Sequence, residues 1–245
     1  MKYLAQYLEL VKMSLLSYRA GIAFVMMVQI VLTIGLVLGY GYLIPDIPKV
    51  AALYVTTGAA TNAAITVSLV VLPQILAEAK HQGRMDYMLT LPISRELYLL
   101  SQVTTAVILA LPGTALAVVF GAWRYDLSLS VNPLLPLVAL LAVFSLAGVG
   151  VAVAALSNHL QVTNAITQLT IFYVIFFAPI LMPKEQLPGM LQSVSTVMPP
   201  TYAADGMRGA LTDLPGTNLG RDLAVLAAFA AGSLTLSAVT IRRRG

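Results

Sequence analysis

Six long runs without a charged residue restrict what this chain can fold into. They cover residues 20–45, 50–77, 97–123, 133–156, 162–183 and 223–241. A helix needs about 20 mostly apolar residues to cross the hydrocarbon core of a membrane, so each run is long enough. The apolar residues are continuous instead of alternating, which favours helices over strands. We therefore predict an all-α polytopic membrane protein with six transmembrane helices in a single transmembrane domain over residues 1–245.

The composition excludes several other classes. The chain is 59% hydrophobic and only 10% charged, whereas soluble domains carry about 25% charged residues. An ordinary cytosolic enzyme, a disordered chain and a nucleic-acid-binding protein are all excluded. Because there is no cysteine, neither a disulfide framework nor a thiolate metal site is available. The start of the chain has no small-residue cleavage site before the first apolar run, so we expect no removable signal peptide.

The distribution of cations predicts the orientation. Six spans place both termini on one side, and the segments on that side hold nine Lys and Arg residues against four acids. The segments on the other side hold five cations against six acids. Since cations concentrate in cytoplasmic loops, both termini are predicted to be cytoplasmic.

The first 19 residues have a helical pattern of their own. Leu4, Leu8, Val11 and Leu15 recur at helical spacing, while Glu9 and other polar residues lie elsewhere around the helix. This pattern predicts an amphipathic helix in the membrane interface. The alternative is a plain extension of the first span.

The inner connection 78–96 carries most of the charge between spans. Met85, Met88 and Leu89 lie at i, i+3 and i+4, which predicts a short helix with one apolar face. Pro92 is expected to end that helix, because proline disfavours helical geometry in the preceding residue. Ser94 is expected to cap the next helix, with Glu96 in its first turn.

The outer connection 184–222 predicts a re-entrant hairpin. Its two apolar stretches, 188–198 and 201–211, are too short to cross a membrane and are separated by Pro199 and Pro200. Asp205 and Arg208 have the spacing of a helix-surface ion pair, worth about 0.2–0.5 kcal/mol. We hypothesise that the hairpin closes the outer end of a translocation path and moves, the alternative being a static lid. The residues assigned to it are Pro188, Pro199, Pro200, Tyr202, Asp205 and Arg208, with Tyr202 expected at the membrane–water boundary.

Several chemistries are missing. No phosphate-binding Gly-x-x-x-x-Gly-Lys-Ser/Thr sequence occurs, and no acid, lysine or arginine lies in the middle of a span. These absences argue against an ATPase, a proton-coupled transporter and a voltage sensor. His81 and His159 each stand alone, so a metal site is not expected. Neutral polar residues do occur within spans, and they either pack between helices or line a path: Thr56, Thr57, Thr61, Asn62, Thr66, Ser68, Gln102, Asn164, Thr167, Gln168 and Thr170.

The inner connection carries a recognisable motif. It reads Glu78-Ala-Lys-His-Gln-Gly83-Arg-Met-Asp86-Tyr-Met-Leu89-Thr-Leu-Pro92-Ile-Ser94-Arg95. This resembles the inner loop of type-2 ATP-binding-cassette (ABC) transporter permeases, and Leu-Pro-Ile-Ser-Arg is similar to the daunorubicin-resistance type. Arg84 departs from the threonine that is common there, and Asp86 replaces a glutamate. The resemblance extends to the outer sequences 182–188 and 198–202.

This resemblance implies a permease subunit of an ABC exporter in the cytoplasmic membrane of a prokaryote, without enzymatic activity of its own. The chain would bind no cofactor, since ATP and Mg would be held by a separate cytoplasmic nucleotide-binding subunit. It would form a homodimer or heterodimer among membrane lipids, without nucleic acid. The inner loop would be the coupling helix, with the contributing residues Glu78, Gly83, Arg84, Asp86, Met88, Leu89, Pro92 and Arg95.

The cargo is left open by the sequence. Apolar spans favour a hydrophobic or amphipathic substrate such as a drug or lipid, and a lipid-linked glycan is an alternative. A non-transporting assembly or sensory subunit would explain the absent ATP motif equally well, and a channel would need a polar stripe along one span.

Overall fold

The computed structural model of this chain is built of helices, and no strand occurs among the residues that it describes, 2–44, 46–90, 93–157, 159–212, 214 and 216–242. The α-helices are α1 (Lys2–Ser17), α2 (Arg19–Leu43), α3 (Lys49–Thr66), α4 (Leu72–His81), α5 (Arg84–Thr90), α6 (Arg95–Tyr125), α7 (Leu135–Leu156), α8 (Leu160–Phe177), α9 (Gly189–Ser195), α10 (Pro199–Leu211) and α11 (Leu219–Arg242). A π-helix, η1 (Val67–Val71), joins α3 to α4, and a 3-10 turn, η2 (Lys184–Gln186), precedes α9.

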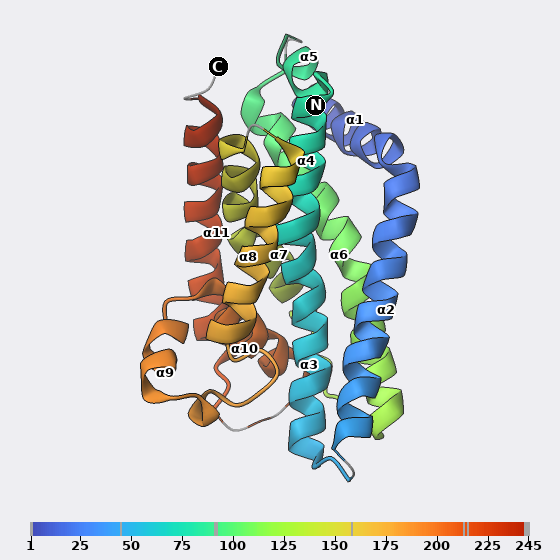
Figure 1. Cartoon of the computed structure of the whole chain (residues 1–245), viewed down its shortest axis with the longest axis vertical. Coiled ribbons are helices and arrows are strands. Elements are labelled where there is room, and N and C mark those ends of the chain that lie inside the picture. Colours follow the sequence, from blue (N-terminus) through green and yellow to red (C-terminus); the bar gives the residue numbers. More distant parts are fainter. Residues whose placement is uncertain are drawn as a thin grey trace.

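The prediction of six membrane-spanning helices is confirmed. Within the described residues, six helices are long and apolar enough to cross a membrane: Gly21–Leu43, Lys49–His81, Glu96–Tyr125, Leu135–Leu156, Leu160–Phe177 and Leu219–Ser237. They form an elongated bundle (Figure 1). The start of α1 and the end of α11 lie at the same end as α5, whereas α9 and α10 lie at the opposite end. We call these the α5 end and the α10 end.

Two spans form the centre of the bundle. In their most apolar stretches, 67% of the residues of Lys49–His81 and 61% of those of α7 are buried, against 17% in α2 and α8. The helix α7 packs against α11, α10, α4 and α6. Helices α2 and α8 therefore expose wide apolar surfaces, which in a membrane protein face lipid or another chain.

The second span is one continuous helix with a π-helical segment in its middle. Pro73, at the start of α4, cannot donate a backbone hydrogen bond, and η1 accommodates the irregularity just before it. The Ser68 hydroxyl in η1 donates 2.8 Å to the Ala64 carbonyl. A side chain at Gly150 of α7 would collide with the Ser68 carbonyl oxygen. The π segment thus packs directly on the backbone of α7, at a position where glycine is required.

The third span also contains a proline, and a side chain from the first span supports it. Pro112 lies inside α6. Gln29 of α2, which is 3% exposed, donates 3.0 Å from its amide nitrogen to the carbonyl of Leu109. A Cβ atom at Gly113 would overlap the Gln29 side chain. Gln29 therefore joins the first and third spans at the irregular turn of α6.

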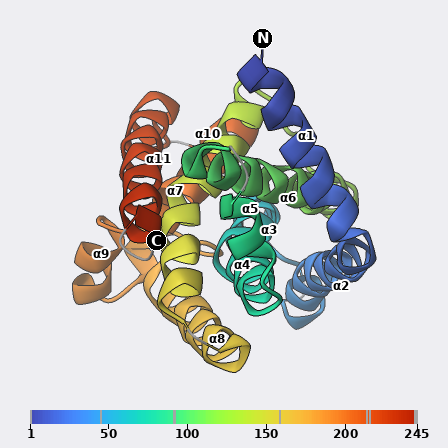
Figure 2. The ribbon, with the colours of Figure 1, turned by 90° about the horizontal axis from the view of Figure 1, so that it is seen from above.

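The N-terminal segment is a separate helix. The backbone departs from helical geometry at Tyr18 (φ −103°, ψ 12°), and α1 is inclined to α2 (Figure 1). The alternative of a plain extension of the first span is therefore wrong. Leu4 and Leu8 are exposed, whereas Val11 is buried against the bundle. The Tyr7 hydroxyl lies 2.5 Å from the Thr104 hydroxyl and fixes α1 to α6 (Figure 2).

The predictions for the short segments between the spans are confirmed in part. The inner helix exists as α5, and Ser94 caps α6 by accepting a 3.2 Å hydrogen bond from the Leu97 amide. Pro92 lies outside the described residues. Pro199 and Pro200 do not separate two helices but are the first residues of α10, a position that suits proline because its missing N–H would be unpaired there.

The fifth span is shorter than predicted. The charge-free run reaches residue 183, but α8 ends at Phe177 and Ala178 is extended (φ −105°, ψ 128°). Pro179 explains this end, because proline disfavours helical geometry in the residue before it. The following carbonyls are left without helical partners and become important at the α10 end.

Candidate functional site

Helix α5 projects beyond the spans at one end of the bundle (Figure 1). Gly83 immediately precedes it with a positive φ of 70°, a conformation that glycine adopts without strain, and no heavy atom would contact a Cβ there. Glu78 and Gly83 are exposed, whereas Arg84 is half-buried. The side chains of Asp86, Leu89 and Arg95 are not among those described.

Met88 faces the chain itself. It is 9% exposed and packs with Leu10 of α1 and Tyr98 of α6, next to the half-buried Met85. The sequence placed Met88 on the apolar face of this helix, and in the structure Met88 attaches α5 to α1 and α6. Among the side chains of α5 that the structure describes, the large exposed one is Tyr87, which is 63% exposed and was not singled out from the sequence.

Arg84 connects α5 to the junction of α1 and α2. Its guanidinium carbon lies 4.9 Å from the centre of the Tyr18 ring, and the Tyr18 hydroxyl donates 3.3 Å to the Ile75 carbonyl of α4. Burial raises the pKa of the Tyr18 hydroxyl, and the Arg84 charge opposes that rise. The hydroxyl therefore remains a neutral donor, and α5 is held against both α4 and the α1–α2 junction.

A groove of about 1020 Å³ lies between α1 and the α5 region. Its walls combine the apolar side chains of Met13, Leu16 and Ile93 with the charged Glu9 and Lys12. Met13 is 43% exposed and Leu16 is 59% exposed. Together with the outer surface of α5, the groove forms a continuous surface that offers both apolar area and charge.

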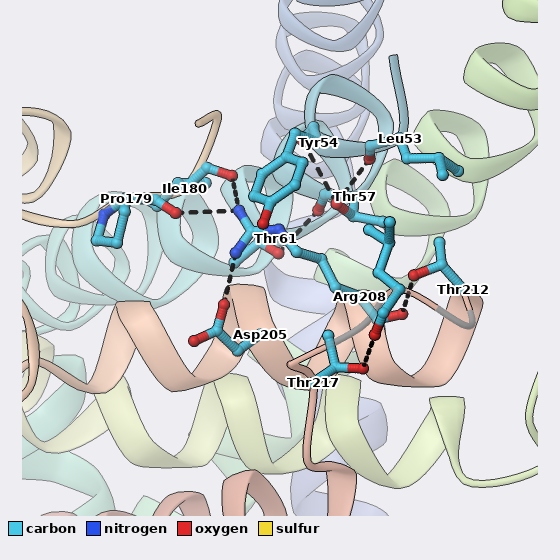
Figure 3. Close-up of polar contacts among 11 residues, drawn as sticks. Leu53, Tyr54, Thr57, Thr61, Pro179, Ile180, Asp205, Arg208, Thr212 and Thr217 are labelled. Atoms are coloured by element: carbon cyan, nitrogen blue, oxygen red, sulfur yellow. Dashed lines mark hydrogen bonds and ion pairs between the residues drawn. The ribbon is translucent and has the colours of Figure 1, made fainter. Parts of the chain in front are cut away.

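At the opposite end, the structure is organised by a buried arginine. Arg208 of α10 is 2% exposed and donates 2.6 Å to the Asp205 carboxylate and 3.0 Å to the Pro179 carbonyl (Figure 3). It also donates to the carbonyl of Ile180. These are the carbonyls left free where α8 ends. The guanidinium lies 4.2 Å from the centre of the Tyr54 ring of α3, which adds a cation–π contact.

Gly58 of α3 allows the second span to approach the carbonyls that Arg208 binds. A Cβ atom at Gly58 would lie 2.6 Å from the Ile180 carbonyl oxygen and 2.7 Å from Leu181, so α3 and the segment after α8 approach closely only with glycine there. We define the Arg208 cluster as Tyr54, Pro179, Ile180, Asp205 and Arg208. It joins the second span, the end of the fifth span and α10. The pair Asp205–Arg208 is therefore not the helix-surface pair that its spacing suggested.

The other residues assigned to the hairpin differ in their surroundings. Tyr202 is 9% exposed, and its hydroxyl donates 2.7 Å to the Thr196 carbonyl, which joins α10 to the end of α9. Pro200 is buried and Pro199 is half-buried, whereas Pro188 is exposed. Because α10 also packs against α3, α7 and α11, it is part of the bundle end and not a free flap.

The neutral polar residues within the spans fall into two groups. Thr56, Thr57, Thr61 and Ser68 of the second span have no exposed surface, so they pack between helices. In α8, Thr163 and Thr167 are buried, but the amides Gln161, Asn164 and Gln168 are exposed. At 100° per residue these three amides fall within about 60° of one another. Exposed apolar residues lie about 100° further around the helix (Val162, Leu169 and Phe176) and, in the second half of α8, also on the amide edge itself (Phe172 and Ile175).

No group of histidine, cysteine and acidic residues that can hold a metal ion occurs in the described part of the chain. His81 and His159 are both exposed, and His159 immediately precedes α8.

Comparisons with known proteins agree with this arrangement. Residues 5–212 match the family described as ABC-2 type transporter. The chain is also 27% identical over 135 residues to Nodulation protein J of Rhizobium meliloti (strain 1021). That alignment covers 55% of this chain and 51% of the relative, so the matched part spans about half the length of that protein.

Replacing Arg208 tests the role of the buried cluster. In Arg208→Met, two carbonyls lose a buried donor, and each buried acceptor left unpaired costs about 1–3 kcal/mol. The Asp205 carboxylate also loses its partner, but its side chain is 38% exposed and can be hydrated. We expect a melting temperature in detergent lower by roughly 2–4 °C for each kcal/mol lost. Arg19→Met is the matched control, because Arg19 is exposed and surface changes cost about 0.5 kcal/mol or less. Equal shifts in the two variants would contradict a structural role of Arg208.

Proposed function

The chain belongs to the ABC-2 type transporter family and is the membrane permease subunit of an ABC transporter; from this premise we propose that it exports an amphipathic cargo. In this proposal a separate cytoplasmic subunit binds ATP and Mg and hydrolyses ATP. The α5 end faces the cytoplasm, α5 is the coupling helix, and two permease chains enclose the path in a prokaryotic cytoplasmic membrane.

The observation that carries the proposal is that α5 is attached firmly to the spans on one side and exposed on the other. A docking helix must transmit a displacement without bending away from the spans. Met88 and Arg84 attach α5 to α1, to α6 and to the α1–α2 junction, while Tyr87 remains exposed for a partner. The adjoining groove with Met13, Leu16, Glu9 and Lys12 extends this surface. We propose that the ATPase contacts both the exposed side of α5 and this groove.

The exposed amides of α8 support a path that is not lined by lipid. Gln168 lies about 12 Å along the helix axis from Leu160, well inside a hydrocarbon core of about 30 Å. Transfer of an unpaired amide from water to hydrocarbon costs about 2–7 kcal/mol. We propose that the edge formed by Gln161, Asn164 and Gln168 faces the path, and that the edge with Leu169 and Phe176 faces lipid.

This division of α8 bears on the cargo. Neutral amides donate and accept hydrogen bonds but carry no charge. They suit a cargo with an apolar part and an uncharged polar part, which describes many amphipathic drugs and lipids and also a lipid-linked glycan. Stimulation of ATP hydrolysis by a series of amphiphiles that share one acyl chain and differ in their polar group would rank these classes.

Coupling should depend on the start of α5. Ile at Gly83 would be forced into the positive φ of 70°, which is strongly unfavourable for a β-branched residue. Asp86→Lys would reverse a charge in the docking helix. We expect both variants to keep the six-span fold but to lose ATP-dependent export or binding of the ATPase, measured in reconstituted vesicles and by co-purification.

The matched control is Gln82→Ile, because Gln82 is exposed, adjacent and has an ordinary φ of −83°. If Gly83→Ile and Asp86→Lys both export at the native rate, α5 is only a connector.

Cysteine labelling tests the division of α8 directly, since the chain contains no cysteine. We expect Gln168→Cys to react with a water-soluble maleimide in membranes and the adjacent Leu169→Cys to react far more slowly, because only the first faces the path. The two substituted positions are adjacent in the chain, so they lie at nearly the same depth in the membrane. Reaction of Leu169→Cys at the rate of Gln168→Cys or faster would refute the assignment.

A further inference from the structure

Lys80 reaches from the last turn of α4 to the end of a different span. Its ammonium group donates 2.8 Å to the carbonyl of Ser157 and 3.3 Å to that of Ala155. The final carbonyls of a helix have no intrahelical partner, and the helix C-terminus carries a partial negative charge. Lys80 therefore caps the end of α7 and the turn that leads into α8.

The contact of Lys80 joins spans that the backbone near α5 does not connect. The segment that contains α5 connects the second span to the third, so a displacement of α5 acts on these two spans through the backbone. The fourth and fifth spans meet at the Ser157 turn, which is remote in sequence from α5. Lys80 lies three residues before Gly83 and holds that turn by two hydrogen bonds.

We infer that Lys80 is a positioning residue for energy coupling. It holds the α7–α8 turn against the end of α4, so that a displacement of α5 moves the second, fourth and fifth spans as one unit. This inference rests on the proposed function of α5 as the coupling helix.

The packing along these helices carries the displacement to the opposite end. Helix α4 packs against both α7 and α8, and α7 packs against α10. In the middle of the bundle, Gly150 lets α7 contact the π segment at Ser68. Beyond α8, the Pro179 and Ile180 carbonyls are held by Arg208. Lys80 and the Arg208 cluster thus both connect the second span with the fifth, at opposite ends of the bundle, and α10 packs against the fourth span.

The experiment measures whether α4 and α8 move together. Spin labels are attached to cysteines at His81 and Leu160, which lie at the ends of α4 and α8 that face α5 and are both exposed. The complex with its ATPase is placed in lipid vesicles, and the distance between the labels is compared without nucleotide and with a non-hydrolysable ATP analogue. In the native background we expect the same distance in both states.

In Lys80→Met we expect the distance to differ between the two states. ATP hydrolysis should continue, but its stimulation by amphiphiles should be lost. Lys80→Arg keeps a cationic donor of similar reach and should behave as the native chain. Lys49→Met is the matched control, because Lys49 is exposed and begins the same continuous helix at its other end. In that control, the distance between the labels and the stimulation of ATP hydrolysis by amphiphiles should both match those of the native chain.

A fixed distance in Lys80→Met, with native stimulation of ATP hydrolysis, would overturn the inference. If Lys80→Met does not fold, Lys80→Gln is measured in the same way and with the same expected change in distance, because its shorter, uncharged side chain replaces the ammonium group that donates to both carbonyls. The proposed function fails separately, when the native complex itself shows no ATP-dependent export. The two failures are therefore distinguishable.

Discussion

A backbone carbonyl that leaves its helix inside a membrane needs a donor, because hydrocarbon offers none. Among the described residues, long cationic side chains meet this constraint at two helix ends. Lys80 donates to the carbonyls that end α7, and Arg208 donates to those that follow α8. In each case the donor comes from a different helix. The same bonds that satisfy the backbone therefore determine which spans are fastened together.

These hydrogen bonds help to divide the bundle into a buried centre and an exposed periphery. The second span and α7 form a buried centre, fastened by Lys80 at the α5 end and adjoined by the Arg208 cluster at the α10 end. Helices α2 and α8 lie at the periphery, and α8 exposes amides along one edge of its first half and apolar side chains elsewhere. For a permease subunit this arrangement separates a rigid centre, which suits the transmission of a displacement, from the outer surfaces that suit cargo, lipid or a second chain.

Local signals in the sequence predicted the spans, the inner helix and the Ser94 cap, because hydropathy, periodicity and capping act over a few neighbouring residues. Burial of Arg208 was not predictable in this way, since a spacing of three residues to Asp205 is the same in a surface pair and in a buried one. The packing of Met88 against α1 was not predictable either, because periodicity defines an apolar face without saying which neighbour covers it. The prolines 199 and 200 were read as a break, although proline is equally suited to begin a helix. Tyr87 and Lys80 gave no signal of their own, since their roles depend on which helices lie beside them.

The central claim is that α5 of this ABC-2 family permease delivers the action of an ATPase to the spans. It is tested most directly by attaching a photoreactive cross-linker to a cysteine at Tyr87, which is exposed on α5, in membranes that contain the ATPase subunit. The account predicts a cross-linked product with the ATPase at this position, and none with the same reagent at Trp123, which is 75% exposed near the opposite end of α6. Absence of the product at Tyr87, or an equal yield at Trp123, would contradict the account.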